Sequence, residues 1–107
     1  MKTFEIDDIE VILGENANEN WKLIDDSDGD YIWMHLESYP SGHIIIKSNK
    51  VSKQFLNQAA QICKDHTKYR AIPQLKACYT CVSNLVKCGK PGSVQFVSNR
   101  QVKSIKI

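Results

Sequence analysis

Two short segments with alternating side chains constrain the fold more than any other part of this sequence. Residues 31–37 (YIWMHLE) and 43–48 (HIIIKS) flank Ser-Tyr-Pro-Ser-Gly, five residues that favour a turn. Strand-forming residues on both sides of a turn predict two neighbouring β-strands. Because successive side chains of a strand point to opposite faces, the pair also predicts which side chains lie together.

Period two separates the aliphatic residues of these strands from a polar and aromatic set. One face receives the aliphatic residues Ile32, Met34, Leu36, Ile44 and Ile46. The other receives Trp33, His35, His43 and Lys47. If the aliphatic face is the core, an indole, two imidazoles and an ammonium group gather on the opposite face, which is unusual for a solvated sheet. The alternative is that the main helix covers this second face and Trp33 is simply a core residue.

The remaining pattern predicts a single α+β domain spanning residues 1–107, with a mostly antiparallel sheet, one long helix and a short N-terminal helix. Ser52 is a good N-cap for the long helix, at about residues 53–69, and Asn16 for the short one, at residues 16–24. Further strands are predicted at residues 4–6, 10–13, 75–85, 93–97 and 102–107. Residues 98–100 are predicted as a hairpin turn between the last two strands.

The distribution of charge is more informative than its total of +2. Residues 1–40 contain two lysines and eleven Asp or Glu residues, a formal charge of −9. Residues 41–107 contain twelve Lys or Arg residues and one Asp, a formal charge of +11. This asymmetry indicates a polyanionic partner for the second part. The alternative is that the two parts neutralise each other within the fold.

Metal, cofactor and membrane functions are not favoured. Cys78 and Cys81 are three apart on a predicted strand and therefore face opposite ways, which argues against a shared zinc ion. The acidic loop at residues 25–30 lacks the acid that a calcium loop needs at its twelfth position, where Leu36 stands. No apolar run reaches 18 residues and the N-terminus lacks a signal-peptide core, so we expect a cytoplasmic protein without cofactors.

Catalytic motifs are also missing. The sequence contains no phosphate-binding loop, no G-x-S-x-G and no H-E-x-x-H. His35, His43 and Asp30 resemble an acid–base group, with Ser41 or a cysteine as nucleophile, but such a constellation is easily drawn in any chain of this length. We therefore do not expect an enzyme.

Four blocks of residues in this order resemble the NFACT-R family, the RNA-binding domain also called domain of unknown function 814. They are GENANEN at 14–20, DYIWMH at 30–35, PSGHIII at 40–46, and a last block made of Ala59-Ala60, Tyr79-Thr80 and KPGSV at 90–94. The resemblance extends from Phe4 to Ile107. In larger relatives this domain accompanies other modules in ribosome quality-control factors that engage tRNA and the large ribosomal subunit.

The resemblance implies a non-catalytic RNA-binding domain, directed to tRNA or rRNA and linked to translation. The expected binding patch contains Trp33, His35 and His43, with Trp33 stacking on an unpaired base if it is accessible. Asn16, Asn20 and Asp30 are expected to orient neighbouring groups. The candidate phosphate contacts are Lys47, Lys64, Lys68, Arg70, Lys87, Lys90 and Arg100.

Two other functions fit the sequence less well. One is a protein-interaction module that docks on a ribosomal or quality-control protein through the acidic part of the chain. The other is an RNA-modifying or hydrolytic enzyme that uses the histidines. The oligomeric state is not specified by any feature of the sequence.

Overall fold

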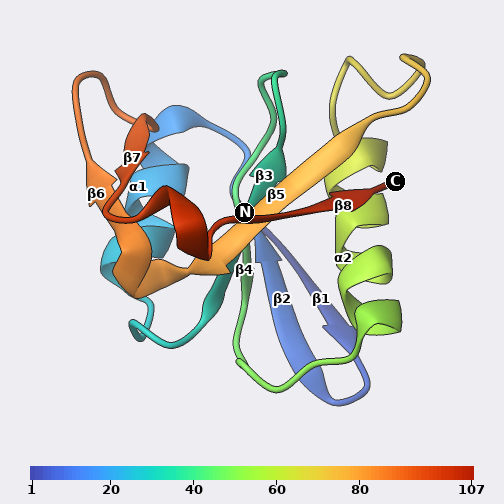
Figure 1. The fold of residues 1–107 in the computed structure, drawn as a ribbon, viewed down its shortest axis with the longest axis horizontal. Helices are drawn as coiled ribbons and strands as arrows, with labels where there is room; N and C mark the ends of the chain where they lie inside the picture. Colours follow the sequence, from blue (N-terminus) through green and yellow to red (C-terminus); the bar gives the residue numbers. More distant parts are fainter.

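A six-stranded antiparallel sheet forms the centre of the computed structural model, which describes all 107 residues (Figure 1). The strand order is β1-β2-β4-β3-β5-β8. The bounds are β1 Lys2–Ile6, β2 Ile9–Leu13, β3 Ile32–Leu36, β4 Ile44–Ile46, β5 Lys76–Cys81 and β8 Lys103–Lys106. The predicted α+β class and the mostly antiparallel sheet are confirmed.

The two strands with alternating side chains are central in the sheet. β3 pairs with β4 in the register Ile32↔Ile46 and Met34↔Ile44. These four side chains lie in the larger core cluster, and Met34, Ile44 and Ile46 have no exposed surface. The prediction that the aliphatic face is the core is therefore correct.

Helix α2, Lys53–Asp65, covers this aliphatic face. Ser52 caps it by accepting a hydrogen bond from the Phe55 N–H. Ala59 and Ala60 are fully buried, and their small side chains allow a close approach to the sheet. Figure 1 shows α2 on one side of the sheet, so the alternative that it covers Trp33 is wrong.

The long helix ends earlier than predicted, at Asp65 rather than near residue 69. His66 is its C-cap, and the next residue is tied to another loop because the Thr67 hydroxyl donates to the Pro40 carbonyl at 3.1 Å. This contact directs the chain over the β3–β4 connection instead of along the helix axis. Neither helix of the protein is long and apolar enough to cross a bilayer.

A smaller layer covers part of the opposite face of the sheet. It consists of α1, Ala17–Asp25, and a two-stranded sheet of β6, Leu85–Lys87, and β7, Val94–Phe96. Asn16 is the N-cap of α1, as predicted, and accepts from the Glu19 N–H at 2.9 Å. Beneath this layer, Trp33 forms a second, smaller core cluster with Leu23 of α1, Ile45 of β4 and Val82.

One strand prediction and one turn prediction in the last third of the chain are wrong. The predicted strand at 75–85 is β5, the 3-10 turn η1 (Val82–Asn84) and β6, which belongs to the other sheet. The break occurs where the buried Asn84 amide donates to Thr80 Oγ1 and to the Ser98 carbonyl. Residues 98–100 are not a hairpin turn, because η2 (Asn99–Gln101) connects β7 to β8 in a different sheet.

Replacing Gly42 by alanine should destabilise the protein. A Cβ at this position would overlap the Gly14 carbonyl oxygen and approach Leu13 Cδ1 to 2.8 Å. Backbone cannot yield as a flexible side chain does, so we expect Gly42→Ala to lower the free energy of unfolding by about 1–3 kcal/mol. Urea denaturation measures this. The control is Gly89→Asn, since Gly89 has open space around it and a φ of +58°, which asparagine tolerates. Equal stability of Gly42→Ala and the wild type would contradict the predicted overlap.

Candidate functional site

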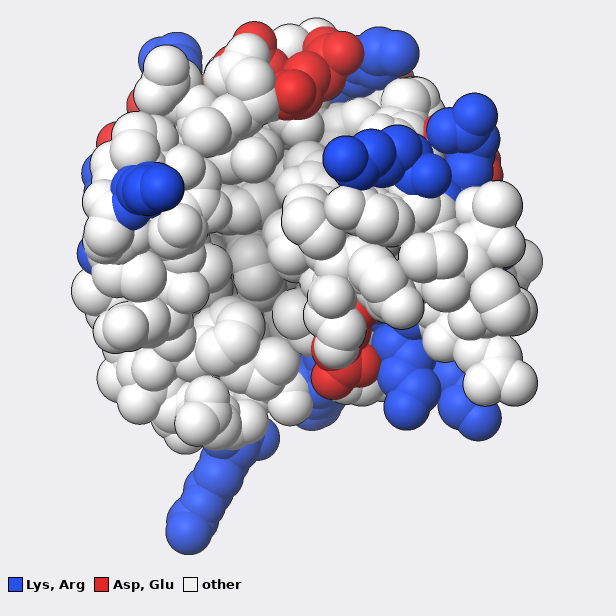
Figure 2. Space-filling view, turned by 90° about the horizontal axis from the view of Figure 1, so that it is seen from above, with Lys and Arg blue, Asp and Glu red and all other residues white.

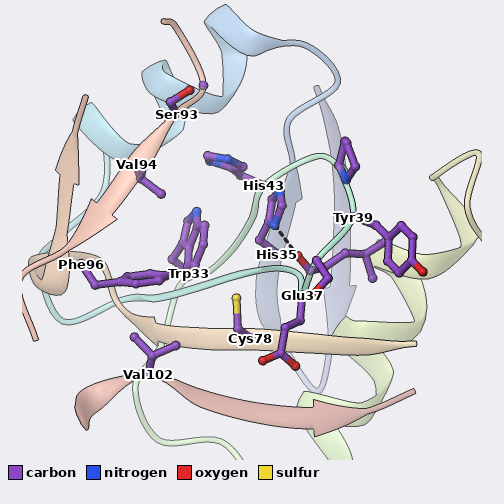
Figure 3. Close-up of a pocket in the computed structure, with 14 residues that line it drawn as sticks. Trp33, His35, Glu37, Tyr39, His43, Cys78, Ser93, Val94, Phe96 and Val102 are labelled. Carbon is purple, nitrogen blue, oxygen red and sulfur yellow. Dashed lines mark hydrogen bonds between the residues drawn. The ribbon is translucent and has the colours of Figure 1, made fainter. Parts of the chain in front are cut away.

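Three aromatic side chains predicted to share a face lie in contact on that face. Trp33 and His35 project from β3, and His43 lies immediately before β4. The Trp33 and His35 rings are parallel, with centroids 5.8 Å apart. The His43 ring meets both at nearly a right angle, with centroids 5.3 Å away in each case. Figure 3 shows the three rings around one hollow.

The backbone of His43 is fixed by residues from the first part of the chain. Its N–H donates to the Asn20 side-chain oxygen at 3.0 Å, and its carbonyl accepts from the Gly14 N–H at 2.9 Å. A Cβ on Gly14 would collide with the Asn20 amide, and a Cβ on Gly42 would collide with Gly14. The two glycines therefore permit the close approach that positions the imidazole.

Both imidazoles are neutral at physiological pH. The pKa of His43 is lowered to about 3, chiefly by burial and to a lesser degree by the neighbouring His35, while a hydrogen bond to the Gly92 backbone opposes the shift. Burial also lowers the pKa of His35, whose Nδ1 lies 2.6 Å from the Leu36 carbonyl oxygen. The two rings therefore act as uncharged hydrogen-bonding groups rather than as cations.

The hollow beside these rings has a volume of about 620 Å³ and is open to solvent. Its walls include the apolar side chains Val94, Phe96 and Val102 and the Glu37 carboxylate. Trp33 and His43 are among the lining residues, but Trp33 Nε1 and His43 Nδ1 are themselves buried and have no hydrogen-bond partner. We call this the first hollow.

A second hollow of about 530 Å³ adjoins the first. The two share the wall formed by His35, Pro40, His43 and Gly92. Lys68 contributes a cation to the second hollow. Together they form a trough that crosses the end of the molecule where the loops before α1, β4, β5 and β7 meet (Figure 1).

The predicted phosphate contacts are distributed around the molecule. Figure 2 views the trough end: the surface is hollowed near its centre, and Lys and Arg side chains stand apart around it. Lys68 lines the second hollow, and Lys64 and Arg70 lie near it in the chain, at the end of α2 and in the following loop. Lys90 is in the β6–β7 loop and Arg100 is in η2.

Two of these candidate lysines already form ion pairs with carboxylates from the acidic part of the chain. Lys47 pairs with Glu10, and Lys87 pairs with Asp25 at 2.6 Å. All four side chains are at least 38% exposed, so each pair contributes little to stability. Mutual neutralisation of the two charged parts is thus real but confined to two pairs.

Trp33 does not offer a face for stacking. Its side chain is 2% exposed, and Phe96 packs against it at right-angled geometry, with a centroid distance of 5.7 Å. A base inserted between Trp33 and His35 would need a ring separation of roughly 7 Å, twice the van der Waals distance, and the rings are 5.8 Å apart. Trp33 is among the residues that line the hollow, but almost none of its surface is accessible.

Sequence reasoning missed several residues of the site. Phe96, Val94 and Gly92 come from the β6–β7 hairpin, whose position over the sheet depends on long-range packing. The block KPGSV was recognised, but its role as a wall was not. Asp30, predicted to orient a neighbour, accepts a long hydrogen bond of 3.4 Å from the Asn49 side chain at the exposed end of β3.

The cysteines lie apart from one another. Cys78 lines the first hollow, and burial raises its pKa to about 11, so it is a thiol at neutral pH. Cys63 is a buried residue of α2, and its thiol donates to Ser41 Oγ. Cys81 is exposed, and all four cysteines are free.

Fold and site together define a small α+β domain that holds a trough against one face of its sheet, lined by an indole and two neutral imidazoles. The chain belongs to the family described as the NFACT protein RNA binding domain, whose profile matches residues 2–98. The family resemblance predicted from the sequence is therefore confirmed.

Two curated relatives and one solved structure agree with this assignment. The chain is 27% identical over 95 residues to the Rqc2 homolog RqcH of Bacillus subtilis (strain 168), covering 86% of this chain and 17% of the relative. It is 28% identical over 108 residues to Protein JLP2 of Saccharomyces cerevisiae (strain ATCC 204508 / S288c), covering 90% and 52%. The chain thus spans about half, or less, of these relatives.

The fold is also that of the C-terminal part of the fibronectin/fibrinogen-binding protein from Streptococcus suis. The TM-score is 0.87 at 21% sequence identity, over 98% of this chain and 43% of that chain. At this identity the similarity establishes the fold alone.

Buried His43 should make the protein less stable in mild acid. Its folded pKa of about 3 lies below the unfolded value of 6.5, so the unfolded state binds the extra proton as the pH falls through 6.5. Above pH 6.5 the contribution of His43 to the free energy of unfolding is fully present. By pH 5 this residue alone should lower the free energy of unfolding by about 2 kcal/mol.

Urea denaturation at pH 7 and pH 5 measures this loss. His43→Gln keeps a neutral amide at the position and should remove the part of the loss that His43 causes, while buried His35, whose pKa is also lowered, still contributes. The exposed His66 provides the control, since His66→Gln should leave the loss unchanged. An unaltered pH dependence in His43→Gln would show that another group causes it.

Proposed function

We propose that this chain is a non-catalytic RNA-binding domain, directed to tRNA or rRNA, that acts in the cytoplasm in translation or ribosome-associated quality control. The observation that carries the proposal is the trough, which combines neutral hydrogen-bonding groups beside apolar walls with a lysine in the adjoining hollow. Membership in an RNA-binding domain family supports the same class of ligand.

Charge supports an electrostatic contribution from only part of the basic set. Lys47 and Lys87 are paired with carboxylates, whereas none of the other five candidates forms an ion pair. These five are Lys64, Lys68, Arg70, Lys90 and Arg100. Such cations neutralise phosphates without first losing an internal ion pair, and they release condensed counterions on binding.

The properties of the candidate catalytic groups argue against an enzyme. A His43 pKa of about 3 is far from the value near operating pH that general acid–base catalysis favours. Ser41 Oγ accepts from the Leu36 N–H and donates to the Gly42 carbonyl, so its contacts are structural. Burial keeps Cys78 protonated, and the thiolate is the nucleophilic form.

The relatives support a connection to the ribosome. One is named as an Rqc2 homolog, and the NFACT-R resemblance brings with it quality-control factors that engage tRNA and the large subunit. We extend this role to the present chain as part of the proposal, with a ribosomal or quality-control protein as a further partner.

Titration with tRNA and rRNA fragments tests the proposal. We expect binding at low salt that weakens steeply as salt rises, measured by fluorescence anisotropy. Lys68→Gln should weaken binding and reduce the slope of log K against log salt by about one, because one phosphate contact is lost.

Lys53→Gln is the matched control for Lys68→Gln. Lys53 begins α2 at the end opposite the loops of the trough (Figure 1), and the substitution removes the same charge. Absence of binding at low salt, or equal weakening by both variants, would contradict the proposal. Capture of a ribosomal protein that survives nuclease and high salt would instead support a protein-interaction module.

A further inference from the structure

We propose that the free edge of β8 is a docking site for an extended acidic peptide segment of a protein partner, which adds a further strand to the sheet. β8 pairs only with β5 and is the last strand in the order of the sheet (Figure 1). The family profile matches residues 2–98 and does not include β8. This site goes beyond the proposed RNA-binding function, which rests on the trough.

The outer edge of β8 presents backbone groups that have no partner. The Ile107 N–H donates to the Leu75 carbonyl at 2.9 Å, which continues the β5–β8 ladder. Because hydrogen-bonded residues alternate along an antiparallel strand, the backbone groups of Ser104 and Lys106 point away from β5. Neither residue's N–H or carbonyl takes part in a hydrogen bond outside the ladder. Two donors and two acceptors therefore face solvent along this edge.

Such an edge is a template for another strand. Extended peptides bind protein sheets in this way, with backbone hydrogen bonds providing affinity and alternate side chains providing specificity. RNA matches the edge less well, because phosphate oxygens can accept from the two N–H groups but cannot donate to the two carbonyl groups. The pattern of backbone groups therefore favours a peptide.

Three exposed lysines determine the charge of the partner. Lys76 of β5 lies directly opposite Lys106 of β8, and Lys103 projects from the other face of the strand. None of the three forms an ion pair, and like charges directly opposite each other on a sheet are destabilising. The carboxylate of Glu37, whose N–H bonds the Lys76 carbonyl, already accepts from Ser104 Oγ at 3.2 Å. Carboxylates on an added strand would relieve the repulsion.

The two lysines of β8 also specify where the partner carries its acids. Lys103 and Lys106 are three residues apart and so project to opposite faces. An antiparallel partner strand should therefore carry acids three residues apart, one on each face. The same lysines repel the β8 edge of a second copy, because lysines on an edge strand oppose pairing with an identical edge. They select an acidic strand.

The peptide acetyl-Thr-Glu-Val-Thr-Glu-Val-amide, whose glutamates are three residues apart, is the probe. Amide spectra and hydrogen exchange of the ¹⁵N-labelled chain follow its binding. In the free chain the Ser104 and Lys106 amides should exchange quickly, while the Ile105 amide, which faces β5, is protected. We expect the peptide to shift the Ser104 and Lys106 signals saturably and to protect both amides from exchange.

Matched peptides separate strand addition from attraction between charges. Methylation of the backbone nitrogens of the second and fourth peptide residues, which face β8, should abolish protection. Methylation of the third and fifth, which face solvent, should leave it in place. Equal binding of the two methylated peptides, or no shift with the unmethylated peptide up to millimolar concentration, would overturn the proposal.

Matched variants of the chain test the lysines. Lys103→Glu/Lys106→Glu should weaken peptide binding about fivefold or more, since two attractive cross-strand pairs become repulsive. Lys50→Glu/Lys53→Glu makes the same change of charge in the β4–α2 segment and should have little effect. Equal weakening by both double variants would contradict the site.

Two further outcomes would assign the edge to another partner and overturn the proposal. One is protection of the Ser104 and Lys106 amides by an oligoribonucleotide, which would make the edge part of the RNA surface. The other is their protection when the concentration of the chain alone is raised, which would make the edge a contact with a second copy. Failure of tRNA binding in the earlier titration leaves this site untouched.

Discussion

The hydrogen bond from the His43 N–H to the Asn20 side chain is the contact on which the site depends. It joins α1 to the start of β4, and the Gly14 N–H holds the His43 carbonyl from the other side. Gly14 and Gly42 lack the Cβ atoms that would prevent this approach. Two of the recognised sequence blocks, residues 14–20 and 40–46, therefore meet around the backbone of His43.

The two faces of the sheet are covered by different elements and to different extents. α2 packs on the aliphatic face, and the resulting core contains most of the buried hydrophobic residues. The smaller layer of α1, β6 and β7 covers only part of the other face. The uncovered remainder is the first hollow. Partial cover explains why His35 and His43 are desolvated enough to stay neutral while an edge of the hollow remains open.

In the proposed RNA-binding function, the first hollow and the basic residues around the trough have different roles. Neutral imidazoles and apolar side chains line the first hollow, whereas separate basic side chains stand around the trough and are the proposed contacts of the polyanion. Five unpaired basic residues provide modest affinity, since each phosphate contact contributes only a part of the salt-dependent term. Weak binding by one domain suits a role in which further contacts, on the RNA or on a partner, raise the overall affinity.

Local sequence determined much of this protein. Alternation at residues 31–37 and 43–48 predicted the strands, their faces and the grouping of Trp33, His35 and His43, because period two is a property of the backbone. The caps at Asn16 and Ser52 were predictable because each side chain accepts from a backbone N–H only three residues ahead. The end of α2 and the break after Cys81 were not predictable. Trp33 as a core residue was one of the two alternatives, but the elements that cover it were not foreseen. Each depends on contacts between distant residues, such as Thr67 with Pro40 or Asn84 with Ser98, and only the tertiary structure brings these together.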